Sequence, residues 1–314
     1  MKAIATEKYG SASVLKQQDI AKPTIASDEI LVQVHASSVN PVDWKVRKGD
    51  VKILTGKKPP QVLGADYAGV VTNIGNAVTD YKVGDAVFGM LDAFKGGAYA
   101  EYAKVKGNEV YHKPSTINFE QAASLPLATL TAYQALVHVA RMKPGAQLLV
   151  NGCTGGVGIA AVQIAKGMGC KITGVCSTKN INLAKQIGVD TVIDYTQESV
   201  LKNKDHYDIF FDVVANQTIS QAKKTLKSGG FYLTTLPSIQ SVVVGRIINL
   251  VSSKKVKNIW VKSNSKDLAA IKELVESKQL HTVIEKTYPI EKIQDAHRHS
   301  ESGRVVGKIV LKVC

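Results

Sequence analysis

The 314-residue sequence has few cysteines and few aromatic residues. Its four cysteines, Cys153, Cys170, Cys176 and Cys314, form no Cys-x-x-Cys pair, and no histidine stands at zinc-finger spacing from them. This excludes a small disulfide-stabilised scaffold and a cysteine-rich metal module. A chain of this size in an oxidising compartment usually carries more cysteines, so we expect a reducing, cytoplasmic setting and leave an organelle open.

The sequence also lacks a long apolar run. Residues 1–19 contain no hydrophobic stretch typical of a secretory signal, so none is expected. Two uncharged windows, at 121–140 and 144–165, are interrupted by polar residues and by proline or several glycines. Neither resembles a membrane span, and we interpret them as a buried helix and a glycine-rich turn.

Acidic residues are fewer than basic ones. The 40 Lys and Arg residues against 26 Asp and Glu residues give a formal net charge of +14, which favours anionic partners and says nothing about the fold. No basic stripe with interleaved aromatic residues is present, so we expect no nucleic-acid partner.

One apolar segment is followed by a basic cluster. Residues 241–251 precede Lys254, Lys255 and Lys257. This pattern is consistent with a peripheral contact on an anionic membrane surface. The alternative is a helix or loop that covers a substrate pocket or a dimer interface.

The order of strand and helix patterns divides the chain. Short strand patterns such as 30–35 and 68–72 dominate the first 110 residues and indicate a β-rich unit. A helix is expected over 119–140, and strands and helices then alternate, which indicates a doubly wound parallel sheet. The fold class is therefore α/β. The expected domains are 1–115, 116–262, and a tail at 263–314 that rejoins the first domain.

A glycine-rich segment separates the first strand and the first helix of the alternating pattern. Gly155 and Gly158 take the second and third places of a Gly-x-Gly-x-x-Gly fingerprint, and Cys153 takes the first. Backbone N–H groups at such a junction bind a dinucleotide pyrophosphate. The candidate cofactor contacts are Gly155, Gly156, Val157 and Gly158. The alternative is a tight turn without a ligand.

An acidic residue is missing where an NAD site would have one. About 20 residues after the fingerprint, the sequence is Ser177-Thr-Lys-Asn180. A carboxylate would repel a 2′-phosphate, whereas Lys179 attracts it, so we predict NADPH rather than NADH. Ser177, Asn180 and Tyr195 are further candidate contacts. The alternative for Lys179 is a solvated lysine at the start of a helix.

Several motifs occur in an order that resembles one enzyme family. They are Val39-Asn-Pro-Val-Asp43, Leu63-Gly-Ala-Asp-Tyr-Ala-Gly-Val-Val71, Val83-Gly-Asp-Ala-Val-Phe-Gly89, Gly96-Gly-Ala-Tyr-Ala-Glu-Tyr102 and Leu125-Pro-Leu-Ala-Thr-Leu-Thr-Ala-Tyr133. Over essentially its whole length, the chain resembles the zinc-independent quinone oxidoreductase branch of the medium-chain dehydrogenases/reductases. Within that branch it is most similar to chloroplast-envelope-type quinone oxidoreductase homologues and to alkenal or enone reductases.

The resemblance implies a GroES-like catalytic domain, a Rossmann domain, and hydride transfer from NADPH to a quinone or an α,β-unsaturated carbonyl. It implies that Lys45, Gly307 and Lys308 also contact the cofactor and that Thr131 lies near the nicotinamide. It further implies a homodimer formed through the last Rossmann strand. The alternative function is an NADPH-binding, peripheral membrane-associated protein with little catalysis of its own.

No metal is expected. Zinc relatives place ligands at positions that match Asn40, Ala65 and Leu127, and neither Ala65 nor Leu127 has a side chain that binds zinc. Without a metal, hydrogen-bond donors must polarise the substrate oxygen, and Asn40 is the candidate catalytic residue. The alternative for Asn40 is a turn residue before Pro41.

Two further features receive a structural interpretation. Tyr67 is a candidate proton source, but a packed core tyrosine is favoured. His297 and His299 have the spacing of a metal-binding pair, but no third ligand is nearby, so we expect a solvated helix end.

Overall fold

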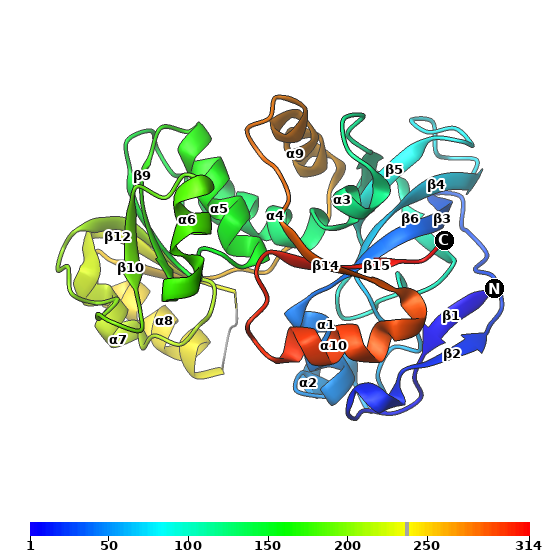
Figure 1. Ribbon diagram of the computed structural model, residues 1–314, viewed down its shortest axis with the longest axis horizontal. Helices are drawn as coiled ribbons and strands as arrows, with labels where there is room; N and C mark the ends of the chain where they lie inside the picture. The colour runs from blue at the N-terminus through cyan, green and yellow to red at the C-terminus, as the bar shows by residue number, and fades with distance from the viewer. Residues whose placement is uncertain (236–238) are drawn as a thin grey trace. The chain divides into compact units, whose positions relative to one another are not determined.

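The computed structural model describes residues 1–235 and 239–314, and the side chains outside 236–244 (Figure 1). Met1–Leu130 and Lys262–Cys314 form one compact unit, and Thr131–Val261 form the other. The sequence placed the first boundary after residue 115, whereas residues 116–130 cluster with the first unit. Both chain termini lie in that unit.

The second unit is built on a six-stranded parallel sheet. In spatial order its strands are β10 (Thr191–Asp194), β9 (Lys171–Cys176), β8 (Gln147–Asn151), β11 (Tyr207–Asp212), β12 (Leu226–Thr234) and β13 (Lys255–Asn258). Leu148, Leu149, Phe210 and Phe211 are fully buried, as expected for central parallel strands that helices cover on both faces. The strand order reverses beside β8, which is where ligands bind in such sheets.

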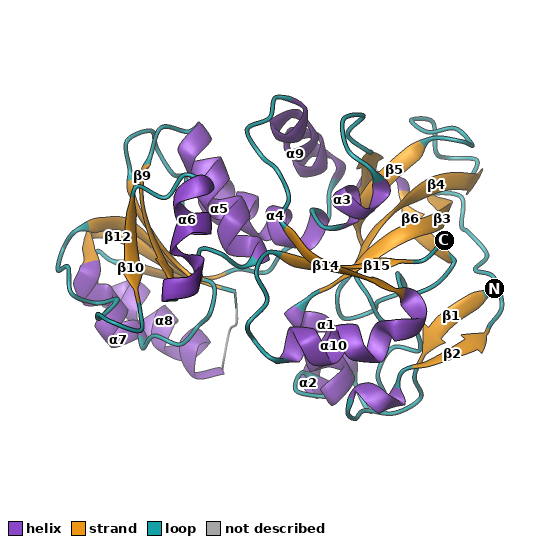
Figure 2. Ribbon diagram, in the orientation of Figure 1, coloured by secondary structure: helices purple, strands orange, loops and turns teal. Residues whose placement is uncertain are grey.

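Helices cover both faces of this sheet. They are α5 (Gly156–Gly167), α6 (Ile181–Gln186), α7 (Ile219–Ala222) and α8 (Ile239–Val251). Figure 2 shows α5 and α6 on one face and α7 and α8 on the other. The predicted doubly wound parallel sheet is confirmed.

The first unit contains a seven-stranded, mostly antiparallel sheet. Its strands are β14 (Ile284–Pro289), β15 (Lys308–Lys312), β3 (Glu29–Val39), β4 (Asp66–Ile74), β5 (Ala86–Met90) and β7 (Val110–His112), with β6 (Tyr102–Lys106) also paired to β3. A separate two-stranded sheet joins β1 (Lys2–Ala5) and β2 (Lys16–Asp19). The tail enters the larger sheet because β15 pairs antiparallel with β3, with Ile309 opposite Val39.

The first unit also contains helices. They are α1 (Pro41–Lys48), α2 (Lys52–Thr55), α3 (Phe119–Ala123), α9 (Ser265–Glu276) and α10 (Ile293–Glu301). Val46 of α1, Ile293 and Ala296 of α10, and Leu311 of β15 share one buried apolar cluster with Val39. Burial of these side chains fixes α1, α10 and β15 against the end of β3.

The expected single helix over 119–140 is wrong. The chain forms α3, then α4 (Pro126–Tyr133), then a π-helical stretch over Gln134–Val139. Pro126 has no N–H to donate, and its ring disfavours a helical conformation at the preceding residue. The helix therefore ends before Pro126, and a new one begins there.

Candidate active site

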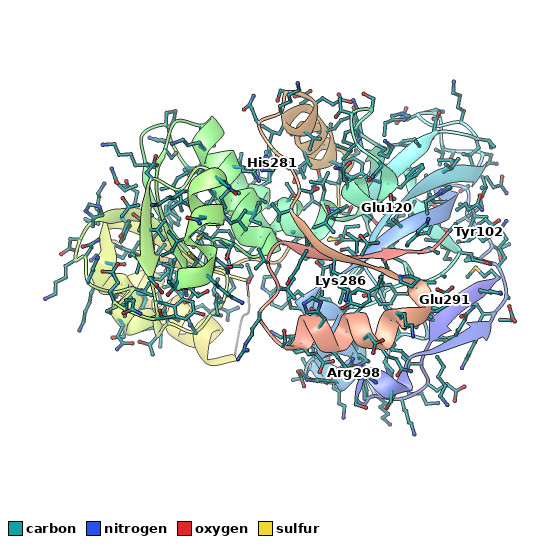
Figure 3. The ribbon with its side chains drawn as sticks, in the orientation of Figure 1. Tyr102, Glu120, His281, Lys286, Glu291 and Arg298 are labelled. Atoms are coloured by element: carbon teal, nitrogen blue, oxygen red, sulfur yellow. The ribbon has the colours of Figure 1, made fainter. Side chains whose placement is uncertain are left out.

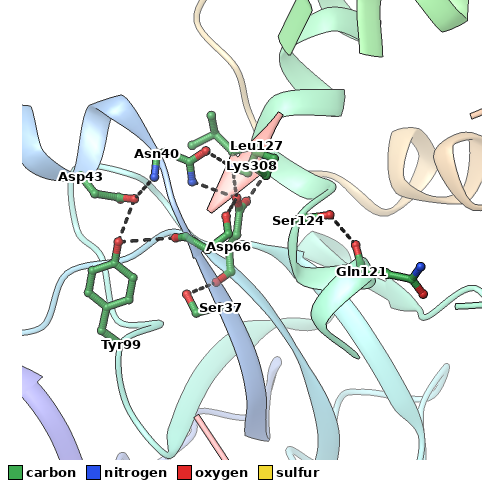
Figure 4. Close-up of polar contacts among 10 residues, drawn as sticks. Ser37, Asn40, Asp43, Asp66, Tyr99, Gln121, Ser124, Leu127 and Lys308 are labelled. Atoms are coloured by element: carbon green, nitrogen blue, oxygen red, sulfur yellow. Dashed lines mark hydrogen bonds and ion pairs between the residues drawn. The ribbon is translucent and has the colours of Figure 1, made fainter. Parts of the chain in front are cut away.

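Asp66 lies at the centre of a buried polar cluster in the first unit (Figure 4). It is the first residue of β4, and its side chain is fully buried. One carboxylate oxygen accepts hydrogen bonds from Ser38 Oγ at 2.6 Å and Asn40 Nδ2 at 2.8 Å, and lies 3.3 Å from Lys308 Nζ. The other accepts from the backbone N–H of Leu127 at 2.7 Å. A buried carboxylate requires such compensation, so Asp66 joins four separate segments at one point.

Asn40 is held on both sides of its carboxamide. It precedes Pro41 at the start of α1, and its backbone N–H donates to Asp43 Oδ2 at 2.7 Å. Its Oδ1 accepts a hydrogen bond from Lys308 Nζ, while one Nδ2 hydrogen points to Asp66. Asn40 is therefore a helix N-cap, close to the alternative drawn from the sequence, and it retains a second Nδ2 hydrogen for another acceptor.

A second buried network extends from Asp43 to the surface. Tyr99 Oη donates to Asp43 Oδ2 at 3.0 Å and lies 3.3 Å from His297 Nε2. Arg47 Nη1 lies 3.2 Å from His297 Nδ1, and Arg47 Nη2 pairs with Glu301 at 2.5 Å. The Arg47 guanidinium can only donate, so Nδ1 accepts and Nε2 carries the hydrogen.

Burial sets the protonation of this network. It raises the pKa of Asp43 to about 7, although the hydrogen bond from Asn40 opposes the change. It lowers the pKa of His297 to about 3, and the charge of Arg47 adds to the effect. The interpretation of residues 297–299 as a solvated helix end is wrong for His297, which is fully buried. Arg298 lies on the exposed face of α10 (Figure 3) and pairs with Asp295 at 2.7 Å.

The residues at the expected ligand positions do not fit zinc. Ala65 has no donor atom, and Leu127 offers a backbone N–H that donates to Asp66. The carboxamide oxygen of Asn40 already faces the ammonium group of Lys308. Among residues 1–235 and 239–314 no cluster of three or more His, Cys, Asp and Glu side chains could hold a metal ion.

The glycine-rich loop in the second unit fits a dinucleotide. Helix α5 has 12 residues, and Gly155 is its N-cap. The first N–H groups of a helix have no intrahelical acceptor and point towards an anion. A Cβ at Gly158 would lie 2.1 Å from the carbonyl oxygen of Gly152, whereas the nearest atom to one at Gly155 is 3.7 Å away. Gly158 is therefore required for loop packing, and Gly155 leaves room for a ligand.

The cysteine in the first fingerprint place has a structural explanation. The left-handed backbone conformation falls at Gly152, with φ +85°, and not at Cys153. The Cys153 side chain is fully buried, and its Sγ lies 2.8 Å from where a Cβ on Gly174 would stand. The space for the thiol comes from the absence of a side chain at Gly174 in β9. The loop can therefore adopt its conformation with cysteine in place of the first glycine of the fingerprint.

The expected 2′-phosphate site lies at the carboxyl ends of β9 and β10. Ser177 is half-buried, Lys179 is exposed, and Tyr195 is 59% exposed. Asn180 Nδ2 donates to Thr154 Oγ1 at 3.2 Å, which ties this segment to the glycine-rich loop. The structure therefore gathers these predicted residues around the loop in one unit.

Asp194, at the end of β10, was missed by the sequence analysis. Its carboxylate accepts hydrogen bonds from Thr178 Oγ1 and from Thr196. The hydrogen bond from Thr178 is the main cause that holds its pKa below the usual value. The hydroxyl groups of Thr178 and Thr196 thus donate to the Asp194 carboxylate, which lies beside the predicted phosphate site.

The other predicted contacts are divided between the units. Thr131 is nearly buried in the second unit. Lys45, Gly307 and Lys308 belong to the first, and burial lowers the pKa of Lys45. At Gly307, with φ +69°, a Cβ would lie 2.1 Å from the carbonyl oxygen of Val283, so packing alone requires glycine there. The Lys308 ammonium group contacts Asn40 and Asp66.

Tyr67 is a core residue, as favoured from the sequence. Its ring belongs to a buried cluster with Ile30 and Val87. Its hydroxyl has no hydrogen-bond partner in the described part of the chain, and burial raises its pKa well above 10. Such a phenol is a poor proton donor.

One unit, which is GroES-like, bears a buried polar cluster, and the other is a parallel-sheet unit with a dinucleotide loop. Together these features define a two-unit nicotinamide-dependent oxidoreductase. Residues 26–115 match the family model described as alcohol dehydrogenase GroES-like domain, and residues 187–311 match the one described as zinc-binding dehydrogenase. The chain belongs to the zinc-independent quinone oxidoreductase branch of the medium-chain dehydrogenase/reductase superfamily, as its motifs predicted.

Two curated relatives and one solved structure illustrate the similarity. The chain is 32% identical to the chloroplastic quinone-oxidoreductase homolog of Spinacia oleracea, covering 99% of this chain and 98% of the relative. It is 34% identical to the chloroplastic NADPH-dependent alkenal/one oxidoreductase of Arabidopsis thaliana, covering 99% and 79%. The quinone oxidoreductase from Coxiella burnetii superposes with a TM-score of 0.91 at 31% identity, covering 100% of this chain and 99% of that one.

Proposed function

We propose that this protein is an NADPH-dependent oxidoreductase that transfers hydride to quinones or α,β-unsaturated carbonyls without zinc. The observation that carries the proposal is the buried cluster around Asn40, in which Asp66 and Lys308 hold a carboxamide donor. Its sequence position is the one that the motifs match to a zinc ligand of the zinc relatives. The named activities of the relatives support the same substrate classes.

NADPH supplies the hydride when it is bound. The N–H groups at the start of α5 bind its pyrophosphate, and Lys179 with Ser177 and Tyr195 binds the 2′-phosphate end. Hydride addition to an enone or quinone leaves negative charge on the substrate oxygen. The second Nδ2 hydrogen of Asn40 donates to that oxygen and stabilises the charge as it develops. The final proton comes from water.

An acceptor panel tests the activity. NADPH oxidation is followed by absorbance with benzoquinones, naphthoquinones, short enones and alkenals, and with saturated ketones as the negative control. Asn40→Ala is expected to lower kcat about 100-fold, in line with the loss of one oxyanion donor, and to leave NADPH binding intact. Binding of NADPH without turnover of any acceptor would contradict the proposal.

The cellular setting and assembly are part of the proposal. We place the protein in the cytoplasm with a small-molecule substrate and no nucleic-acid partner, and an organelle is the other location considered.

We also propose a homodimer, because two-fold symmetric pairs are the commonest oligomers and β13 lies at one edge of the six-stranded sheet. Sedimentation velocity should give twice the chain mass of 33.7 kDa.

The alternative is a membrane-associated NADPH-binding protein. Ile247, Leu250 and Val251 are exposed on α8, which favours it. However, Lys254 pairs with Asp205 at 2.7 Å, and Lys255 Nζ donates to the carbonyl of Asn249 at 3.0 Å. Residues 236–238 and the side chains of 239–244 lie outside the described residues. No helix in the described part of the chain is long and apolar enough to cross a membrane.

A further inference from the structure

We infer that Lys308, together with Asp66, is a positioning residue that fixes and polarises the Asn40 carboxamide for hydride transfer. The inference rests on the proposed function, since it assigns a role to Lys308 within the same site. The sequence suggested Lys308 only as a cofactor contact. Its Nζ instead lies against Asn40 Oδ1 and 3.3 Å from Asp66 Oδ2, and the residue is 7% exposed.

The two charges determine the orientation of the carboxamide. An ammonium group has only donors, and an ionised carboxylate has only acceptors. With Oδ1 towards Lys308 and Nδ2 towards Asp66, both contacts are favourable. Rotation of the amide by 180° would place its NH2 group against the ammonium and its oxygen against the carboxylate. One orientation is therefore strongly favoured.

The same contacts strengthen Asn40 as a donor. A cation on the carbonyl oxygen of an amide draws electron density from nitrogen, and hydrogen bonds in a buried chain polarise one another. The second Nδ2 hydrogen consequently carries more positive charge than that of an isolated amide. Reorganisation around this hydrogen is small, because Asn40, Asp66 and Lys308 are each at least nine-tenths buried.

The anchoring of Asp66 makes the arrangement rigid. Ser38 in β3, the start of α1, the backbone of α4 and Lys308 in β15 all contact this one carboxylate. Lys308 reaches it because β15 pairs with the end of β3, where Leu311 is opposite Ser37. The tail of the chain thus completes the candidate site inside the first unit.

The test is a kinetic double-mutant cycle between Lys308→Met and Asn40→Ala, with cofactor and acceptor varied separately. Lys308→Met is expected to lower kcat about 10-fold and to leave the KM for NADPH within about two-fold, because the ammonium acts through Asn40. In the Asn40→Ala background it should change kcat less than about two-fold. Lys312→Met, on the exposed face of β15, is the matched control and should behave as wild type. Additive losses, or a large rise in the KM for NADPH alone, would overturn the inference.

A second variant distinguishes two possible effects of Lys308, the positioning of Asn40 and the neutralisation of the buried Asp66 carboxylate. Lys308→Met leaves Asp66 unpaired and could prevent folding, whereas Asp66→Asn/Lys308→Met removes both charges. If the ammonium orients and polarises Asn40, the kcat of the Asp66→Asn/Lys308→Met double variant should be as low as that of Lys308→Met. Recovery of wild-type kcat in the neutral pair would show that only charge balance matters and would contradict the inference.

A measurement that does not depend on turnover tests the Lys308–Asn40 contact separately from the proposed function. Urea unfolding of the cofactor-free protein is measured for the same cycle. If Lys308 and Asn40 are coupled, the midpoint of the double variant should lie close to that of Lys308→Met. Wild-type protein that reduces no acceptor would refute the proposed function, whereas independent midpoint shifts would refute the Lys308–Asn40 contact itself.

Discussion

Lys179 carries the predicted preference for NADPH. Its side chain is exposed just after β9, where we expect the 2′-phosphate of NADPH, a group that NADH lacks. Lys179→Ala should raise the KM for NADPH about 10-fold and leave the KM for NADH nearly unchanged. Steady-state kinetics with both cofactors provides the measurement.

Lys185 supplies the control for this prediction. It is exposed on α6, six positions along the chain, and Lys185→Ala removes the same charge away from the expected phosphate. Its kinetic constants should match those of wild type. Equal increases in the KM for both cofactors in Lys179→Ala would count against 2′-phosphate recognition.

The cysteines differ in accessibility. Cys314 is exposed, whereas Cys153, Cys170 and Cys176 are buried. The hydrogen bond with Cys176, together with burial, raises the pKa of the Cys153 thiol, which lowers its reactivity further. An aromatic disulfide reagent should therefore titrate one thiol quickly in the folded protein and four in urea. Rapid reaction of two or more thiols in native buffer, or of any thiol in folded Cys314→Ser, would be inconsistent with this burial.

At the scale of residues, the sequence singled out Asn40, whose catalytic role stays a prediction, and it overlooked Asp66. Asn40 was found because its position matches a zinc ligand and its amide can donate. Asp66 was quoted only as part of a motif, although an acid inside the run Leu63–Val71 must be buried with partners. Its partners come from residues up to 242 positions away, so spacing along the chain could not identify them.

At the scale of elements, α1 and α10 are joined by the network of Asp43, Tyr99 and His297. Burial raises the pKa of Asp43 from 3.8 to about 7. Between those values the folded protein holds a proton that the unfolded chain releases. The contribution of Asp43 to stability is therefore fully present below about pH 4 and is lost as the pH rises through about 7.

Asp43→Asn tests this pH dependence. The variant keeps an acceptor for the Asn40 N–H and removes the titration. Relative to the variant, the free energy of unfolding of wild type should fall by on the order of 1 kcal/mol per pH unit between about pH 5 and about pH 7. Urea unfolding across this range measures the difference. Parallel curves for the two proteins would show that Asp43 is already ionised in the folded state.

Elements with strong local patterns were predicted well. The strand patterns at 171–176 and 308–312 coincide with β9 and β15, because apolar runs bounded by turns signal buried strands. The interrupted helix before Pro126 was missed because an apolar window outweighed the local effect of proline. The pairing of β15 with β3 was expected only as a rejoining of the tail, since register depends on distant partners.

At the scale of the whole molecule, the charge of +14 is the property that bears on membranes. Lys254 and Lys255 are engaged within the second unit, and Lys257 is exposed. Replacement of all three lysines by alanine should therefore remove little of any affinity for anionic vesicles. Flotation with phosphatidylserine vesicles measures this, and binding of wild type should weaken as salt rises.

The exposed apolar side chains of α8 could also contribute to vesicle binding, and a second variant tests them. Leu250 is 87% exposed, so Leu250→Ser tests the apolar contribution without changing charge. Loss of flotation in the triple-lysine variant, with NADPH binding retained, would support the membrane-associated alternative. Unchanged flotation would assign the attraction to the general surface charge.

The Cys153 thiol fits in the loop because Gly174 has no side chain, and this dependence limits which substitutions the loop tolerates. A side chain at both positions would put Sγ 2.8 Å from the new Cβ, which would also meet Val189 at 2.8 Å. Replacement of Gly174 by alanine would therefore displace the Cys153 thiol and Val189 together, and a smaller residue at position 153 would relieve only one of the two close contacts.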